Sequence, residues 1–155
     1  MATTYSFLDI TATFTDNNGD AISLGYGAGT AKEGLTVEML DDKSKLDIGS
    51  DGTPMHSLRA SNAARVMVRL LKTSPTNNYL SVVYGVQRLS PALWGQNAIS
   101  VRDILQGDVL SAAAVAFSRQ PVITYAEDAT MNEWSFLCGS LDELLGIGIP
   151  DLSVL

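Results

Sequence analysis

The sequence predicts a mainly β protein, an antiparallel sandwich or barrel with one flanking α-helix. Three observations favour this class. Apolar and polar residues alternate in several segments, clusters of Gly, Asn, Asp and Pro divide these segments, and only one segment combines helical spacing with a helix-start signal. Eight or nine strands and one helix fit a sheet with the helix at its side or mouth. The 155 residues contain no obvious linker or repeat, so we expect one domain from 1 to 155.

The N-terminal segment predicts a strand and its hairpin partner. The segment from Tyr5 to Thr15 predicts a strand. Its even positions are apolar from Leu8 onwards and its odd positions are polar from Asp9 onwards, and this period of two is typical of a half-buried strand. The polar run 16–20 predicts a turn, and Ala21–Leu24 returns as the partner strand. Residues 25–29 are rich in Gly but lack the Lys-Ser/Thr pair of a phosphate-binding loop, so we expect a bend or bulge there.

Two further strands flank a long polar segment. Leu35–Met39 and Arg65–Leu70 both alternate, and the second places three apolar side chains on one face. Between them, residues 41–55 are polar and Gly-rich, with Leu46 and Ile48 alternating inside the run. This segment predicts either a long protruding hairpin or a mobile loop, and long loops in compact domains usually have a function or are disordered.

The helix is expected from Pro75 to Leu89. Ser74 can cap it and Pro75 suits its first turn. One face is apolar and is formed by Leu80, Val83 and Tyr84, with Tyr79 and Val86 at its edge. Gly85 costs roughly 1 kcal/mol relative to Ala inside a helix, so we interpret it as a mark of close packing.

The C-terminal third predicts more strands. Asn97–Leu105 is a strand, whereas Leu110–Phe117 fits a helix by its alanine run and a strand by its alternation. Residues 128–132 predict a turn, and Glu133–Cys138 a strand with Trp134, Phe136 and Cys138 on one face. Residues 141–149 form an apolar tail interrupted by Gly, and 150–155 are expected to pack on a neighbour or to fray.

Few side chains in this composition can carry chemistry. One Cys (Cys138) excludes an intramolecular disulfide, and one His (His56) excludes a multi-histidine metal site. A net charge of −7 argues against tight nucleic-acid binding. No apolar run is long enough for a membrane span and the first residues do not resemble a signal peptide, so we expect no membrane anchor and folding in the cytosol. We expect no catalytic residue, cofactor or metal, which favours a structural assembly protein over an enzyme.

The charges are segregated along the chain. Residues 1–58 carry three Lys and nine acids, residues 59–119 carry seven bases and two acids, and residues 120–155 carry six acids and no base. These blocks are either scattered over an ordinary surface or form complementary faces. In the second case the protein can dock head to tail on its own copies.

Several strings of residues resemble those of tail tube proteins from tailed bacteriophages, especially phages with contractile tails. The matching strings are Tyr5–Thr13, Glu33–Met39, Gly49–Leu58, Arg69–Pro75 and Glu133–Phe136. The most specific of them is the run Leu-Leu-Lys-Thr-Ser-Pro at 70–75. None of the strings is a catalytic signature.

The resemblance implies a fold and a function. Tail tube proteins, like the tube-forming component of type VI secretion, have a β-sandwich or barrel with a flanking helix. Six copies close into a ring, and rings stack head to tail into a hollow tube that conducts DNA without binding it specifically. The implied partners are other copies of the chain, the tail sheath, the baseplate hub, the tape-measure protein and the terminator. The implied location is the virion tail, assembled in the cytoplasm of the host bacterium.

Three sets of residues become candidates for assembly. Segment 41–55 matches the part that reaches the neighbouring ring, and the expected inter-ring contacts are its charged residues Asp41, Asp42, Lys43, Lys45, Asp47 and Asp51. The expected charge pairs between subunits involve Arg65, Arg69 and Lys72. The expected lumen residues, on the polar face of the first strand, are Asp9, Thr11 and Thr13. The helix is expected to flank the sheet and to help join subunits.

Two other functions stay open. A tube terminator or a baseplate hub component has the same fold but stops at a ring. A small β-barrel that binds a ligand, or an enzyme, needs an apolar cavity with converging polar groups. The enzyme alternative also needs His56 or Asp51 at the floor of a cleft.

Overall fold

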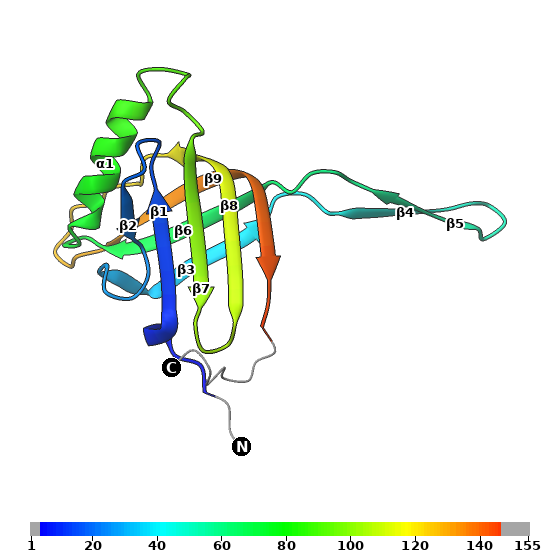
Figure 1. The fold of residues 1–155 in the computed structure, drawn as a ribbon, viewed down its shortest axis with the longest axis horizontal. Helices are drawn as coiled ribbons and strands as arrows, with labels where there is room; N and C mark the ends of the chain where they lie inside the picture. The colour runs from blue at the N-terminus through cyan, green and yellow to red at the C-terminus, as the bar shows by residue number, and fades with distance from the viewer. Residues whose placement is uncertain (1–3, 147–155) are drawn as a thin grey trace.

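The computed structural model describes residues 4–146 and contains one curled sheet, one helix and one projecting hairpin (Figure 1). A 3-10 turn, η1 (Phe7–Asp9), precedes the first strand, and the single α-helix of the described part is α1 (Thr76–Gln87). The strands are β1 (Ile10–Thr15), β2 (Ala21–Ser23), β3 (Thr30–Met39), β4 (Ser44–Ile48), β5 (Pro54–Leu58), β6 (Ala64–Leu71), β7 (Asn97–Asp103), β8 (Asp108–Arg119) and β9 (Met131–Leu144). The expectation for 150–155, and part of that for 141–149, lies outside the described residues.

Seven strands form one antiparallel sheet in the order β2-β1-β7-β8-β9-β6-β3. The long strands β8 and β9 run through both halves of this sheet, so β1 and β7 stand upright while β6 and β3 cross obliquely behind them (Figure 1). The sheet therefore curls into a half-barrel whose concave side encloses the core. The predicted mainly β class with one helix is confirmed.

The sheet bends where β8 and β9 change their alternation together. The buried positions step by three residues, from Ala112 to Val115 and from Cys138 to Leu141, whereas a regular strand steps by two. Ala114 has a φ of 53° at this point, and a Cβ on Gly139 would lie 3.0 Å from the Ala114 Cβ. Small residues thus permit the bend, which explains why an alanine run with helical propensity forms a strand here.

The core is continuous and rich in aromatic rings. Phe117 lies at its centre, with its ring centroid 5.1 to 6.4 Å from those of five other aromatic residues. These neighbours are Phe14, Tyr84, Trp94, Trp134 and Phe136. Such tilted and edge-to-face pairs add to the burial of apolar area. Because these residues come from both halves of the curled sheet and from the helix region, the core fixes the curl.

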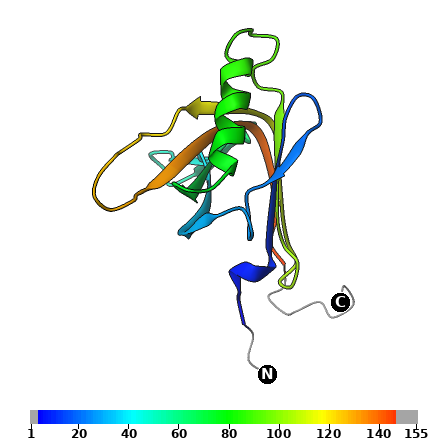
Figure 2. The same cartoon turned by 90° about the vertical axis from the view of Figure 1, so that its left-hand side faces the viewer.

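The helix α1 packs at one side of the curled sheet (Figure 2). Leu80 and Val83 are buried, as predicted, but Val86 is exposed. Ser74 stands one residue before the capping position, where its Oγ accepts a hydrogen bond from the Thr76 N–H (3.3 Å) and donates one to the Ala28 carbonyl (2.5 Å). The interpretation of Gly85 as a close contact is wrong, because a Cβ there meets nothing within 4 Å.

Several boundaries differ from those predicted. The first strand begins at Ile10, because Phe7–Asp9 form a 3-10 turn whose start is capped by Ser6. β3 begins at Thr30, five residues earlier than expected, with a register shift against β6 between Thr30 and Leu35. β9 begins inside the predicted turn 128–132 and continues through Leu144.

Residues 25–29 form the expected bend. Gly25 is required there because a Cβ would lie 2.8 Å from the Ile10 carbonyl oxygen.

Candidate assembly surfaces

Segment 41–55 is a hairpin, and it projects far from the body of the molecule (Figure 1). At its base the hydroxyl of Ser61 donates to Asp41 Oδ2 (2.8 Å), and Lys43 Nζ donates to the Asn62 side-chain oxygen (2.8 Å). Two of the predicted contact residues therefore fix the direction in which the hairpin leaves the sheet. Asp42 lies exposed beside them.

The tip of the hairpin is built by Asp51. The backbone N–H of Thr53 donates to Asp51 Oδ1 (3.0 Å), and this hydrogen bond is the main cause that lowers the pKa of Asp51. Gly52, with a φ of 88°, completes the turn. Lys45 and Asp47 form a loose ion pair along one strand (3.8 Å). All the charged residues predicted for this segment lie on the hairpin or its base.

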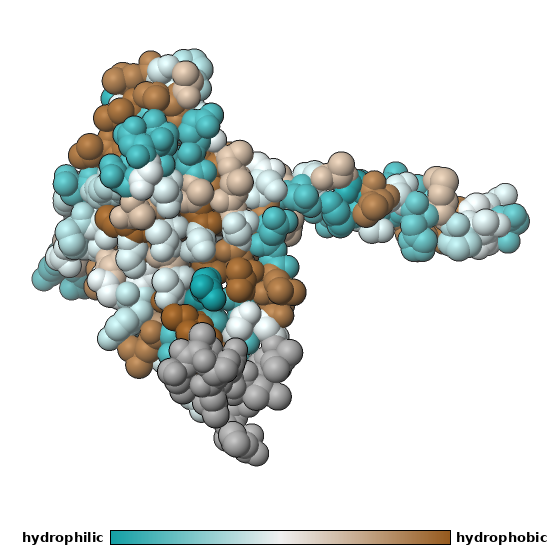
Figure 3. Space-filling view, in the orientation of Figure 1, coloured by the Kyte–Doolittle hydropathy of each residue, from teal (hydrophilic) through white to brown (hydrophobic). Residues whose placement is uncertain are grey.

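One face of the hairpin is apolar, a feature that the sequence analysis missed. Cross-strand partners share a face, and the pairs are Ser44 with Leu58, Leu46 with His56, and Ile48 with Pro54. Leu46, Ile48 and Leu58 are each more than half exposed. Apolar side chains interrupt the polar surface of the hairpin in the space-filling view (Figure 3). The signal was the alternation of Leu46 and Ile48, which charged neighbours obscured.

A second surface covers β1, β7, β8 and the end of β9, on the side of the sheet away from the core. Thr11 pairs with Arg102, Thr13 with Ser100, and Ser100 in turn with Ser111. We call this surface the hydroxyl face. Its members are Thr11, Thr13, Thr15, Ala98, Ser100, Arg102, Val109, Ser111, Ala113, Ser140, Asp142 and Leu144.

The hydroxyl face is neutral in a chain of net charge −7, since its charged members are one Arg and one Asp. Thr11 and Thr13 lie on it, as the predicted polar face of the first strand requires. Asp9 does not, because it belongs to the 3-10 turn before β1. The predicted strand started at Tyr5, whereas β1 starts at Ile10, so Asp9 does not share this face.

The three predicted cations lie on or beside β6 and have different environments. Arg69 forms an ion pair with Glu133 (3.0 Å) and donates a hydrogen bond to Thr36 (2.8 Å), both in its own chain. Lys72 donates to the Thr124 carbonyl and lies 4.4 Å from the centre of the Tyr125 ring. Arg65 stands opposite Glu38 in the sheet, and its Nε is buried with no hydrogen-bond partner in residues 4–146. Arg65 is thus the cation with spare hydrogen-bonding capacity.

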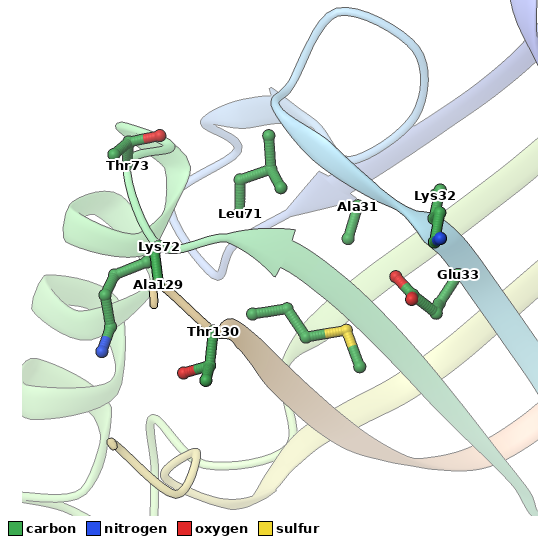
Figure 4. A pocket seen from close by; sticks show the side chains of 9 residues that line it. Ala31, Lys32, Glu33, Leu71, Lys72, Thr73, Ala129 and Thr130 are labelled. Atoms are coloured by element: carbon green, nitrogen blue, oxygen red, sulfur yellow. The ribbon is translucent and has the colours of Figure 1, made fainter. Parts of the chain in front are cut away.

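The loop between β8 and β9 is an exposed apolar surface that the sequence analysis also missed. Val122, Ile123 and Tyr125 are about half exposed or more, and the loop bulges away from the sheet (Figure 2). Beside it, a groove of about 610 Å³ separates the Lys72–Thr73 segment from Lys32 and Glu33 of β3 (Figure 4). The side chains around this groove do not converge on one point, unlike those of a binding pocket for a small molecule.

The reactive residues have ordinary structural positions. His56 is exposed on β5, in the hairpin that projects from the body (Figure 1). Cys138 is buried in the core, and burial raises the pKa of its thiol to about 11. In the described part of the chain, His, Cys, Asp and Glu residues do not gather in groups of three or more that could hold a metal. Residues 4–146 also contain no helix that is long and apolar enough to cross a membrane.

The comparison with known families decides what kind of protein these surfaces belong to. The family model of the bacteriophage PhiTE tail tube protein matches residues 1–146. This chain belongs to that tail tube family. The members are structural proteins and not enzymes. Because the family is one of tail tubes, this tail tube protein is a component of the virion tail.

Solved structures show the same fold at low sequence identity. A chain of the anti-feeding prophage baseplate, described as 6-fold symmetrised, has a TM-score of 0.61 at 10% identity, covering 93% of this chain and 97% of that one. A chain of the anti-feeding prophage tube-terminating cap has a TM-score of 0.60 at 9% identity, with 94% and 95% covered. A chain of the sheath–tube complex of the extracellular contractile injection system PVC has a TM-score of 0.57 at 9% identity, with 92% of both covered.

No curated protein sequence matches this tail tube protein. Its family therefore rests on the family model, and its fold is shared with components of contractile injection systems.

Proposed function

We propose that this chain is the repeating subunit of a phage tail tube. Six copies form a ring, and rings stack head to tail into a hollow tube that conducts DNA during ejection. The observation that carries the proposal is the projecting hairpin β4–β5, which extends from a body of the tail tube fold with an apolar face uncovered by residues 4–146. A contact between two different surfaces of identical subunits repeats without end unless the rotation closes it.

The ring of six has support from one neighbour of the same fold. The anti-feeding prophage baseplate chain comes from a structure described as 6-fold symmetrised. The sheet edge at β2, which no strand of residues 4–146 covers, suits a contact with the neighbouring subunit of the ring. Arg65 is the cation that we assign to a carboxylate of the neighbouring subunit. Arg69 is on the same face of β6, and Lys72 directly follows that strand.

We assign the hydroxyl face to the lumen, with Asp9 next to it, just before the start of β1. Hydroxyl groups bind water and present little charge, so this face neither neutralises phosphates nor repels them strongly. DNA can then slide past Thr11, Thr13 and Ser111 without being held.

The partners follow from the tail. The hairpin, with the charged residues Asp41 to Asp51, contacts the next ring. The first and last rings contact the baseplate hub and the terminator, the outer surface contacts a sheath, and the tape-measure protein occupies the lumen before DNA. Assembly takes place in the cytoplasm of the host bacterium. The sheath has support from the PVC neighbour, which is part of a sheath–tube complex.

A tube terminator or a baseplate component is a second candidate, because the cap and baseplate chains of the anti-feeding prophage match the fold as well as the PVC chain does. A terminator forms a single ring, whereas a tube subunit forms stacks of rings. Ring number therefore separates the two candidates.

The test is negative-stain electron microscopy of the purified full chain over a series of concentrations, with light scattering in parallel. We expect sixfold rings that stack into hollow tubes, alone or after addition of baseplate seeds. A variant in which a two-residue turn replaces 44–58 should stop at rings or monomers while its circular dichroism still reports the folded sheet. Single rings from the full chain favour the terminator. A persistent monomer, even with seeds, contradicts both candidates.

A further inference from the structure

An apolar groove runs along the open side of the half-barrel, between β1 and β3. It has a volume of about 510 Å³, and its apolar lining comes from Phe7, Ile10, Leu35, Val37 and Val101. β3 is an edge strand that pairs with β6 alone, so its outer edge carries backbone groups that no strand of the described part takes up. The groove therefore offers both apolar surface and a strand edge, the two features that receive an added strand.

The hairpin β4–β5 has matching properties. Leu46, Ile48, Pro54 and Leu58 lie on one of its faces and are exposed. A two-stranded hairpin is only marginally stable in water by itself, and a large exposed apolar surface usually marks an interaction site. Each of its two strands also has one edge without a partner strand in residues 4–146. The hairpin thus has an apolar face and free strand edges, and the groove offers an apolar surface and a free strand edge that match them.

The hairpin cannot reach the groove of its own chain. It leaves the body beyond Met39, at the end of β3, and points away from the sheet (Figure 1). The groove lies along β3 from Thr30 to Val37 and at the start of β1. The hydrogen bonds of Asp41 and Lys43 hold its base pointing away from the body. A hairpin that occupies this groove therefore comes from a second copy.

Charge also favours this pairing. The hairpin and its base carry four acids and two Lys between residues 41 and 58, a net negative charge. The groove itself carries one base and one acid, Lys32 and Glu33, and the adjoining groove of Figure 4, which shares both of them, adds Lys72 at its far side. A negative hairpin approaching this positive border is attracted to it.

We propose that the apolar face of the hairpin of one copy binds the groove between β1 and β3 of a second copy, adding a strand to the free edge of β3. This inference deepens the proposed function, on which it rests, because it names the surface that receives the hairpin when rings stack. The side chains that pack in the groove are Leu46, Ile48, Pro54 and Leu58. The charged residues of the hairpin set the direction and rate at which the hairpin approaches the groove.

Disulfide trapping with matched hairpin positions tests the inference. Ile48→Cys and Met55→Cys occupy opposite faces of the same hairpin, and both native side chains are 59% exposed. Each variant is mixed with Leu35→Cys protein under assembly conditions, and a mild oxidant is added. We expect the mixture with Ile48→Cys to form the mixed disulfide at least about tenfold faster than the mixture with Met55→Cys. Neither variant should cross-link by itself at that rate.

The same pair of positions gives a second readout by electron microscopy. Ile48→Asp should prevent stacking, whereas Met55→Asp should leave tubes intact. Tubes without the Ile48–Leu35 cross-link, or with an equal Met55–Leu35 cross-link, overturn the inference and leave the proposed function standing. Cross-linked pairs without rings or tubes keep the inference and overturn the proposed function. The absence of both overturns both.

Discussion

Ala114 is the one non-glycine residue in 4–146 with a positive φ, and it sits at the bend that shapes the whole sheet. A left-handed conformation costs an L-residue about 1–2 kcal/mol, and Gly avoids that cost while losing about 0.5–1 kcal/mol of chain entropy. We expect Ala114→Gly to leave the free energy of unfolding unchanged or to raise it by up to about 1 kcal/mol. Ala114→Val should lower it by more than about 1 kcal/mol, because a β-branched residue adopts this conformation poorly.

The control for Ala114 is its exposed neighbour Ala113. Ala113→Gly carries only the entropic cost and should lower stability by about 0.5–1 kcal/mol. Urea unfolding monitored by tryptophan fluorescence measures all three variants. Equal losses in Ala114→Gly and Ala113→Gly would show that Ala114 is not strained.

Cys138 gives a prediction in the alkaline range. Burial raises the pKa of its thiol to about 11 from an ordinary value of about 9. The unfolded chain therefore releases this proton at lower pH than the folded chain. The contribution of Cys138 to stability is complete below about pH 9 and is lost as pH rises through about 11.

The measurement is urea unfolding of the native chain and of Cys138→Ala from about pH 8 to about pH 11. The native chain should lose stability more steeply than the variant over this range. Burial and the Asp16 carboxylate raise the pKa of Tyr79 to about 12. Tyr79 therefore adds the same dependence of stability on pH to both proteins. Parallel curves would mean that the thiol ionises freely in the fold.

At the scale of elements, a pair of buried amides joins the end of α1 to the sheet. Gln87 and Asn97 exchange two hydrogen bonds (2.6 and 2.9 Å), and both side chains are almost fully buried. Gln87→Ala leaves the Asn97 amide without its partner, so we expect a loss of about 2 kcal/mol or more in the free energy of unfolding.

Replacing both amides by Leu separates pairing from burial. The double variant Gln87→Leu/Asn97→Leu should lose less stability than the sum of the losses in the single variants Gln87→Leu and Asn97→Leu. The double variant leaves no unpaired polar group, whereas each single variant leaves one. Ser81→Ala, on the exposed side of α1, serves as the control and should change stability by less than about 0.5 kcal/mol. Additive losses for the double variant contradict a coupled pair.

The elements that the sequence predicted well are those with a clean period. Arg65–Leu70 and Glu133–Cys138 alternate without interruption, because one side of each faces a continuous core, and the structure has them as strands. The alanine run in β8 was ambiguous, because a shared bend with β9 breaks the alternation at Ala114 and Gly139. A local pattern cannot show a bend that depends on a partner strand.

The candidate surfaces were predictable to a different degree. Segment 41–55 was recognised by its composition. Its apolar face depends on the register that pairs Ile48 with Pro54, and this register cannot be read from the sequence. Arg69 was expected to reach a neighbouring subunit, whereas its nearest acid is Glu133, brought beside it by the pairing of β6 with β9. Residue type suggests a contact, but register decides which partner is in reach.

At the scale of the whole molecule, the distribution of charge distinguishes the surfaces from one another. The hairpin is acidic, the side of the sheet around β6 sets Arg65 and Arg69 against Glu38 and Glu133, and the hydroxyl face has one Arg and one Asp among hydroxyl and small side chains. The hydroxyl face thus combines little charge with many hydroxyl groups. It suits a passage for a polyanion, in which attraction would slow movement and repulsion would oppose entry.

Adding positive charge to the hydroxyl face tests where it lies in the assembly. Ser111→Lys tubes, assembled with a short DNA duplex, should retain the duplex at low salt, protect it from nuclease and release it as salt rises, because each phosphate contact is salt-dependent. Native tubes should retain none. Ser81→Lys, on the exposed side of α1, is the matched control: DNA held there lies outside the tube and is digested. If nuclease digests the duplex on Ser111→Lys tubes as well, the hydroxyl face lies on the outside of the tube, and another surface of the subunit forms the channel.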